Sequence, residues 1–264
     1  MAGYFGTAVQ QRLQARAEDA AAFIAATPGA CQVGRMMGCD DPDRLGWDHI
    51  GEVLRHDLAF GFRLIDRDRV DDLRSRLAER GCRLDTWQVF LADRASALAA
   101  SQTILSRGLP AGLAELERAR DPDGDGIRRI QAHMAAAGIA PFSGSMLTGA
   151  CGPAVTVGFK DAEGGILATA HGYLPHSVHS PYQRYAWGGL VAVAAEARAQ
   201  GLGSLVNARL IAEVFRELEA THIYELVSDT NVASRRMVEA CGLRAEPGLV
   251  CGVGVAEDST RFTR

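Results

Sequence analysis

The stretch Arg198-Ala199-Gln200-Gly201-Leu202-Gly203-Ser204 decides the fold, because it joins a strand pattern to a helix pattern. The residues before it, 188–193, are small and apolar, as in a buried strand. After it, apolar residues recur at helical spacing from 205 to 218. A glycine turn that leads into a helix exposes unpaired backbone N–H groups at the positive end of the helix dipole. Such a turn binds a phosphate group or simply makes a tight connection, and local sequence leaves both readings open.

A second motif lies towards the C-terminus. Residues 223–228 have a strand pattern, and Asn231 is a good N-cap for a short helix that Gly242 closes. Together the two motifs resemble the GCN5-related N-acetyltransferase (GNAT) superfamily. Its diphosphate loop, Gln/Arg-x-x-Gly-x-Gly/Ala, is matched by Arg198, Gly201 and Gly203. Its later motif is a strand followed by an Asn-x-x-Ser/Ala helix that ends in Gly-Phe or Gly-Leu.

The resemblance covers residues 84–256 and implies an α/β (α+β) fold of the GNAT type, a mixed, mostly antiparallel central sheet flanked by helices. The apolar periodicity is consistent with that order of elements. It predicts helices at 95–105 and 126–137, and strands at 86–91, 154–159, 166–173, 188–193, 223–228 and 248–255. We therefore predict a GNAT acetyltransferase domain over residues 84–264.

Residues 1–83 are predicted to form a helical N-terminal extension. The helical patterns lie at 8–26, 47–60 and 68–80, and Gly81 closes the last of them. Three roles stay open for this part: it shapes the substrate pocket, it mediates formation of a homodimer, or it is a degenerate repeat of the domain that follows.

Composition excludes several classes of partner. The chain has 264 residues and a net charge of −4, with no basic run interleaved with aromatic residues, so we expect no binding to nucleic acid or to anionic membranes. It has neither a signal-peptide pattern nor a membrane-spanning apolar segment, and we expect a cytoplasmic location. The six cysteines lack the paired short spacing of zinc sites, which favours free thiols.

The resemblance implies acetyl-CoA as co-substrate. In GNAT proteins the strand before the loop pairs its free backbone groups with the pantetheine arm, and one of its amides polarises the thioester carbonyl. The loop amides hold the diphosphate, and a later asparagine, which here is also a plain N-cap, contacts the coenzyme. Mapped onto this sequence, the coenzyme residues are Val191, Ala192, Val193, Arg198, Ala199, Gln200, Gly201, Leu202, Gly203, Ser204 and Asn231.

Glu225 is the predicted general base, which the reaction needs because an ammonium group cannot attack a thioester before it loses a proton. Glu225 interrupts the apolar strand face of Ile223 and Val227, and burial of this carboxylate would raise its pKa. The alternative is a solvent-exposed glutamate at a strand edge.

The sequence offers no single general acid, because Val238 stands where many GNAT enzymes have a tyrosine that protonates the leaving thiolate. Tyr224, Tyr185 and Ser234 are the substitutes. Departure of the thiolate without help is equally open, because an ordinary thiol has a pKa of about 8.5.

The segment 171–187 concentrates histidine, tyrosine and tryptophan between two strands. In a GNAT fold it would border the acceptor, and the predicted acceptor residues are His176, His179, Tyr182, Tyr185 and Trp187. The two histidines have no third ligand at a suitable spacing, so we expect no metal site.

The predicted function is an acetyl-CoA-dependent N-acetyltransferase in which the primary amine of a small molecule attacks the thioester directly. The alternatives are a non-catalytic acyl-CoA-binding sensor or interaction module, and a GNAT enzyme that uses a longer acyl-CoA or a protein acceptor.

Overall fold

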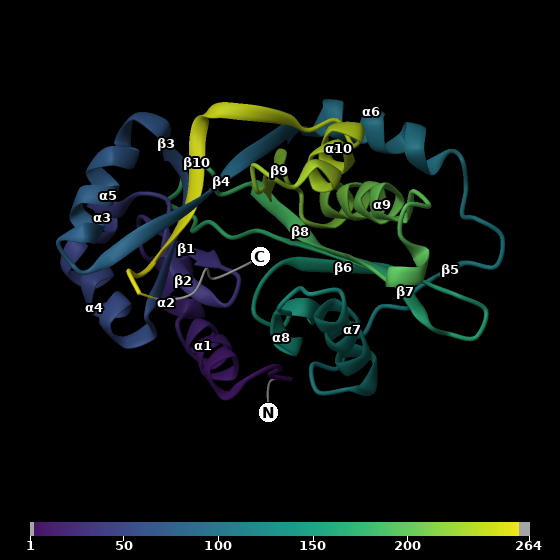
Figure 1. Cartoon of the computed structure of the whole chain (residues 1–264), viewed down its shortest axis with the longest axis horizontal. Helices are drawn as coiled ribbons and strands as arrows, with labels where there is room; N and C mark the ends of the chain where they lie inside the picture. Colours follow the sequence, from purple (N-terminus) through teal and green to yellow (C-terminus); the bar gives the residue numbers. More distant parts are fainter. Residues whose placement is uncertain (1–2, 259–264) are drawn as a thin grey trace.

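The computed structural model describes residues 3–258 (Figure 1). Its first part contains α1 (Ala8–Asp19), α2 (Ala21–Ala26), β1 (Ala30–Val33), β2 (Met36–Cys39), α3 (Pro42–Leu45), α4 (Trp47–Asp57), β3 (Ala59–Asp66), the 3-10 turn η1 (Arg67–Arg69), α5 (Val70–Ala78) and β4 (Cys82–Asp93). The remainder contains α6 (Arg94–Leu105), β5 (Ala114–Glu115), α7 (Asp125–Ala136), α8 (Gly144–Thr148), β6 (Ala154–Lys160), β7 (Ile166–Tyr173), β8 (Tyr185–Val193), η2 (Ala195–Ala197), α9 (Leu202–Glu217), β9 (His222–Val227), α10 (Val232–Ala240) and β10 (Arg244–Ala256).

Within residues 3–258 ten strands form one sheet, in the order β1-β2-β3-β10-β4-β9-β8-β7-β6-β5. Most neighbouring strands are antiparallel, whereas β2 with β3 and β8 with β9 are parallel. This is the mixed, mostly antiparallel α/β sheet that the sequence predicts. Helices α6, α9 and α10 lie on one side of the sheet, and α7 and α8 lie on the other (Figure 1).

The amphipathic helices anchor the second half of the sheet. On α7, the side chains of Ile127, Ile130 and Met134 are buried at helical spacing. Helix α9 is buried along much of its length and forms the centre of the largest apolar cluster, where Val206 and Ile211 are fully enclosed. No helix within the described residues is long and apolar enough to cross a membrane.

The first part is not purely helical, and this corrects the prediction of a helical extension. Its helices lie where the periodicity indicates, but β1, β2 and β3 extend the common sheet. The first two strands have only four residues each, too few for a clear pattern. Strand β3 is buried at nearly every position, so polar and apolar residues do not alternate along it. The predicted boundary at residue 83 lies inside β4, and the division into domains stays a prediction.

The sheet has an internal repeat centred on the β10–β4 pair. On one side β10 is antiparallel to β3, which is parallel to β2; on the other β4 is antiparallel to β9, which is parallel to β8. Helix α4 connects β2 to β3 as α9 connects β8 to β9, and α5 and α10 precede the last strand of each half. Each half therefore gives its last strand to the other. Among the three roles left open for the first part, this topology favours a degenerate repeat.

Candidate active site

Strands β8 and β9 run side by side over only part of their length. Their parallel pairing extends from Tyr185–His222 to Gly188–Glu225, and in the described chain no pair follows. Leu190 has a φ of 50°, and the register between β8 and β7 shifts at this point. Strand β8 consequently turns away from β9, and the edge of residues 189–193, which we call the open edge, has no β9 partner among the described residues. The His133 Nε2 lies 3.4 Å from the Ala192 carbonyl on this stretch.

The loop after β8 has the conformation of an anion site. Gly201 has a φ of 81°, a left-handed conformation that favours glycine, and α9 begins at the next residue. The first N–H groups of α9, on Leu202, Gly203 and Ser204, have no acceptor within the helix. Among the described residues, nothing lies within 4 Å of a Cβ placed at Gly201. A Cβ at Gly203 makes only ordinary contacts of 3.6 and 3.8 Å. The open helix start fits a diphosphate.

Side chains around the loop order its backbone. Arg198 is exposed, and its Nε donates a hydrogen bond to the Val193 carbonyl at 3.3 Å. The Nε2 of Gln200 donates to the Glu196 carbonyl at 3.0 Å. The side chain of Asn231 accepts from the Ser234 N–H at 3.0 Å, as an N-cap does. The eleven coenzyme residues inferred from the resemblance therefore lie on the open edge, the loop and the start of α10, and their contacts with coenzyme stay predictions.

A cavity of about 270 Å³ lies where β8 and β9 part. Its first wall comes from β8, β9 and α10, and its second wall comes from the first part of the chain. The first wall includes Trp187, Gly188, Val191, Glu225, Ser234, Met237 and Val238, and the second includes Val33, Gly34, Arg35, Met36 and Arg63.

Glu225 is buried at this cavity rather than exposed at a strand edge. Glu225 is 3 % exposed, and its Oε1 accepts a hydrogen bond from Asn207 Nδ2 at 2.7 Å. Burial raises the pKa of Glu225 to about 7, although the hydrogen bond from Asn207 opposes the shift. A carboxyl group with this pKa can accept a proton near neutral pH.

Tyr224 does not line the cavity. Alternation along β9 directs it to the face opposite Glu225, where its hydroxyl lies 3.3 Å from His176 Nε2. The His176 Nδ1 is in turn 2.6 Å from Asp40 Oδ2. Burial raises the pKa of Tyr224 well above its usual value, which weakens it as a proton donor. Ser234, by contrast, lies on the cavity wall.

Among the five predicted acceptor residues, Trp187 lines the cavity and the other four lie outside its lining. His176 is buried against Asp40, His179 and Tyr182 border a different pocket, and Tyr185 stacks on His222 with ring centroids 4.1 Å apart. The cause is a β-bridge between Cys31 and His176, which ties this segment to β1. Residues 176–185 therefore lie outside this cavity, whose second wall comes from the first part of the chain, and the part of these residues in acceptor binding stays a prediction.

Sequence reasoning missed Arg35 and Arg63. Both are buried, at 8 % and 6 % exposure, and both line the cavity. For Arg63 the sequence held a signal, because an arginine inside the apolar run Ala59–Asp66 is unusual: a buried guanidinium needs a partner.

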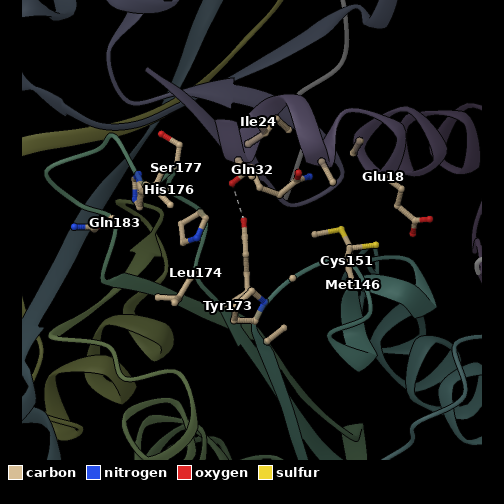
Figure 2. Close-up of a pocket in the computed structure, with 18 of the residues that line it drawn as sticks. Glu18, Ile24, Gln32, Met146, Cys151, Tyr173, Leu174, His176, Ser177 and Gln183 are labelled. Atoms are coloured by element: carbon tan, nitrogen blue, oxygen red, sulfur yellow. Dashed lines mark hydrogen bonds between the residues drawn. The ribbon is translucent and has the colours of Figure 1, made fainter. Parts of the chain in front are cut away.

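A second cavity, of about 310 Å³, lies between the N-terminal helices and the end of β7 (Figure 2). Tyr173 points across it, and its hydroxyl donates to the Gln32 carbonyl at 3.1 Å. The backbone N–H of Gly34 donates to the same hydroxyl at 2.8 Å. These contacts fasten β1 and β2 to the rest of the sheet.

Comparison with known proteins agrees with this geometry. Residues 145–243 match the acetyltransferase (GNAT) family, and this segment holds the open edge, the loop and Glu225. No curated protein matches the chain.

Solved structures are similar over nearly the whole chain. A GCN5-related N-acetyltransferase from Kribbella flavida is 15% identical and has a TM-score of 0.57, with 93% of this chain and 96% of that chain covered. A Drosophila protein is 14% identical with a TM-score of 0.60, covering 95% and 90%. A tandem GNAT protein from the clavulanic acid biosynthesis pathway is 16% identical with a TM-score of 0.52, covering 92% and 89%. The resemblance to the GNAT superfamily is confirmed for residues 145–243, and the solved structures share the fold of the chain.

Proposed function

We propose that this protein is an acetyl-CoA-dependent N-acetyltransferase that acts on the primary amine of a small molecule. The observation that carries the proposal is the position of Glu225, which is buried at the last β8–β9 pair and beside the cavity. A buried carboxyl group with a pKa of about 7 suits deprotonation of an amine.

In this proposal separate residues bind the coenzyme and carry out the acyl transfer. The N–H groups at the start of α9 bind the diphosphate of acetyl-CoA, and the open edge of 189–193 binds its pantetheine arm. An N–H of Val191–Val193 polarises the thioester carbonyl. The acceptor nitrogen forms a bond to the acyl carbon, the carbon–sulfur bond breaks, and the proton of the amine passes to Glu225, directly or through water.

The thiolate leaves into an apolar part of the cavity formed by Met237 and Val238. Of the three substitutes for the missing tyrosine, Ser234 has a hydroxyl group on the cavity wall. It is therefore the preferred donor where the thiolate is protonated inside the site. Unassisted departure remains compatible with the ordinary acidity of a thiol.

Thiol release from acetyl-CoA in the presence of a panel of amines tests the proposal. The panel contains amino acids, simple alkylamines and polyamines, and a series of longer acyl-CoA donors tests the chain length. We expect release that depends on both an amine and acetyl-CoA. Binding of acetyl-CoA without turnover of any amine would instead indicate the non-catalytic sensor.

A further inference from the structure

We propose that the acceptor carries a carboxylate group beside its amine, and that Arg63 binds this carboxylate. The inference rests on the proposed function, since it names the class of acceptor for that site. Amino acids and other amino carboxylates belong to this class, whereas polyamines and simple alkylamines do not.

Arg63 is a buried cation that lines the cavity without a counter-ion. The residue is 6 % exposed, and its Nε has no hydrogen-bond partner in the described structure. None of the ion pairs among the described residues includes Arg63. An uncompensated buried charge is strongly unfavourable, so an anion at this position would stabilise the site.

Weakly acidic side chains that influence Arg63, among them two tyrosines and a cysteine, are neutral. Burial raises the pKa of Tyr173 to about 12 and that of Tyr224 well above its usual value, although Arg63 lowers both. Burial also raises the pKa of the Cys251 thiol. These three groups therefore leave the positive charge of Arg63 uncompensated near neutral pH.

Asp40 influences the same buried region but has other partners. Its Oδ2 lies 2.6 Å from His176 Nδ1 and accepts a hydrogen bond from Ser180 Oγ at 2.6 Å. Arg63 is instead near the Trp187 ring, with Cζ 6.0 Å from the ring centroid. The guanidinium also hydrogen-bonds with the Tyr173 hydroxyl and the Cys251 thiol, but both groups are neutral and do not balance its charge. An anionic ligand would balance it, and the planar fork of the guanidinium matches a carboxylate.

The cavity has the chemistry of a site for an amino carboxylate. Arg63 stands on the wall made by the first part of the chain, and Glu225 stands on the wall made by β9. Arg35, on the same wall as Arg63, adds a second positive charge. An acceptor that places its carboxylate at Arg63 can direct its amine to Glu225. The aromatic rings of Trp87, Phe142 and Trp187 border the space between.

The first experiment compares each amino carboxylate with the matching amine that lacks the carboxylate. The panel holds the twenty common amino acids, β-alanine and γ-aminobutyrate, each with its decarboxylated counterpart. We expect kcat/KM for an active amino carboxylate to exceed that of its counterpart by about 100-fold, because truncating one partner of a buried charge pair has an effect of this size. In Arg63→Met this preference should collapse, with little change in KM for acetyl-CoA.

The second experiment measures binding without turnover. Phenylacetate and its neutral isostere phenylacetamide are titrated into the protein, and quenching of tryptophan fluorescence is followed, since Trp87 and Trp187 line the cavity. We expect phenylacetate to bind at least about 10-fold more tightly than the amide. The preference should vanish in Arg63→Met and survive partly in Arg63→Lys. Arg74→Met, which removes an exposed charge on α5, should leave it unchanged.

The outcomes separate the two proposals. Selective binding of phenylacetate through Arg63 with no turnover of any amine would refute the proposed enzyme and retain the anion site. Equal turnover of amino carboxylates and their decarboxylated counterparts would overturn the inference and retain the enzyme. Equal binding of phenylacetate and phenylacetamide by the wild-type protein would also overturn the inference, whether or not Arg63→Met folds.

Discussion

Glu225 is the residue where stability and the proposed activity oppose each other. Its carboxyl group is enclosed between β9 and α9, with Asn207 as its hydrogen-bond donor. An ordinary glutamate would be ionised at neutral pH, but burial raises the pKa of this one to about 7. The carboxylate can therefore accept a proton near neutral pH. Above about pH 7 it carries a buried negative charge, which destabilises the folded protein.

Replacement Glu225→Gln should lower kcat/KM by about 100-fold or more, because a general base contributes a factor of this size. The base acts when deprotonated, so wild-type activity should rise with pH through about 7, and the variant should lack this inflection. Steady-state rates from pH 5.5 to 9 measure both effects. A variant with wild-type rates and the same pH profile would show that another group takes the proton.

The same substitution should change stability in a pH-dependent way. Because the folded pKa of about 7 lies above the ordinary glutamate pKa of 4.5, the native state binds more protons between these values, and wild-type stability falls as pH rises through that window. The fall amounts to about 3 kcal/mol. Glu225→Gln should therefore match wild type near pH 5 and exceed it at pH 8, as measured by urea unfolding. Equal stabilities at pH 8 would argue against a buried carboxylate.

Tyr224 illustrates how a residue next to a predicted base can have a different role. Its hydroxyl faces His176 and not the cavity, so Tyr224→Phe should reduce stability by about 1 kcal/mol through the lost hydrogen bond. The value of kcat should stay within a few-fold of wild type, whereas Ser234→Ala serves as the comparison on the cavity wall. A loss of kcat of about 100-fold in Tyr224→Phe, at unchanged folding, would make it the general acid after all.

At the scale of elements, the separation of β8 from β9 creates the site. The pairing stops after Gly188 and Glu225, and the bulge at Leu190 turns β8 outward. The strand periodicity predicted both strands within a few residues. It could not predict where their pairing ends, because this depends on a single backbone conformation at Leu190 and on contacts between strands.

The open edge gives a prediction for hydrogen exchange. Backbone amides in 189–193 that face the gap should exchange faster in the free protein than those of the paired strand residues 222–225. Addition of acetyl-CoA should slow the exchange of 189–193, because the pantetheine arm pairs with this edge in the proposed complex. Exchange followed by mass spectrometry with peptide resolution measures the effect. Protection confined to other strands would place the coenzyme elsewhere.

At the scale of the molecule, the first part of the chain completes the sheet and the cavity. Sequence patterns located its helices but not its strands, and the resemblance did not extend to it. The buried run of β3 lacks alternation, and its role becomes visible only when β10 pairs with it. The position of His176 outside the cavity could not be predicted for the same reason, since the bridge between Cys31 and His176 joins segments that are distant in sequence. Local patterns cannot reveal such a contact.

Each half of the sheet pairs its last strand with the other half, so we predict that neither half folds on its own. A chain that begins at residue 81 lacks β1–β3, so Leu249–Val255 keeps β4 but loses β3, and the cavity loses Arg63. We expect this truncated protein to aggregate, as followed by size-exclusion chromatography and circular dichroism. The matched control shortens the exposed loop at 107–112, which should leave folding intact. A monomeric, cooperatively unfolding truncated protein would contradict the exchange of strands.

The central claim is that the start of α9 binds the diphosphate of acetyl-CoA, and calorimetric titration of Gly203→Asp tests it most directly. A side chain at Gly203 points into the space near Met237 and Val193. An aspartate there would interact favourably with the helix dipole but would repel a diphosphate. We predict that wild type binds acetyl-CoA, that Gly203→Asn binds it more weakly, and that Gly203→Asp shows no heat of binding while melting at or above the wild-type temperature. Equal affinity in all three proteins, or no heat with wild type, would contradict the account.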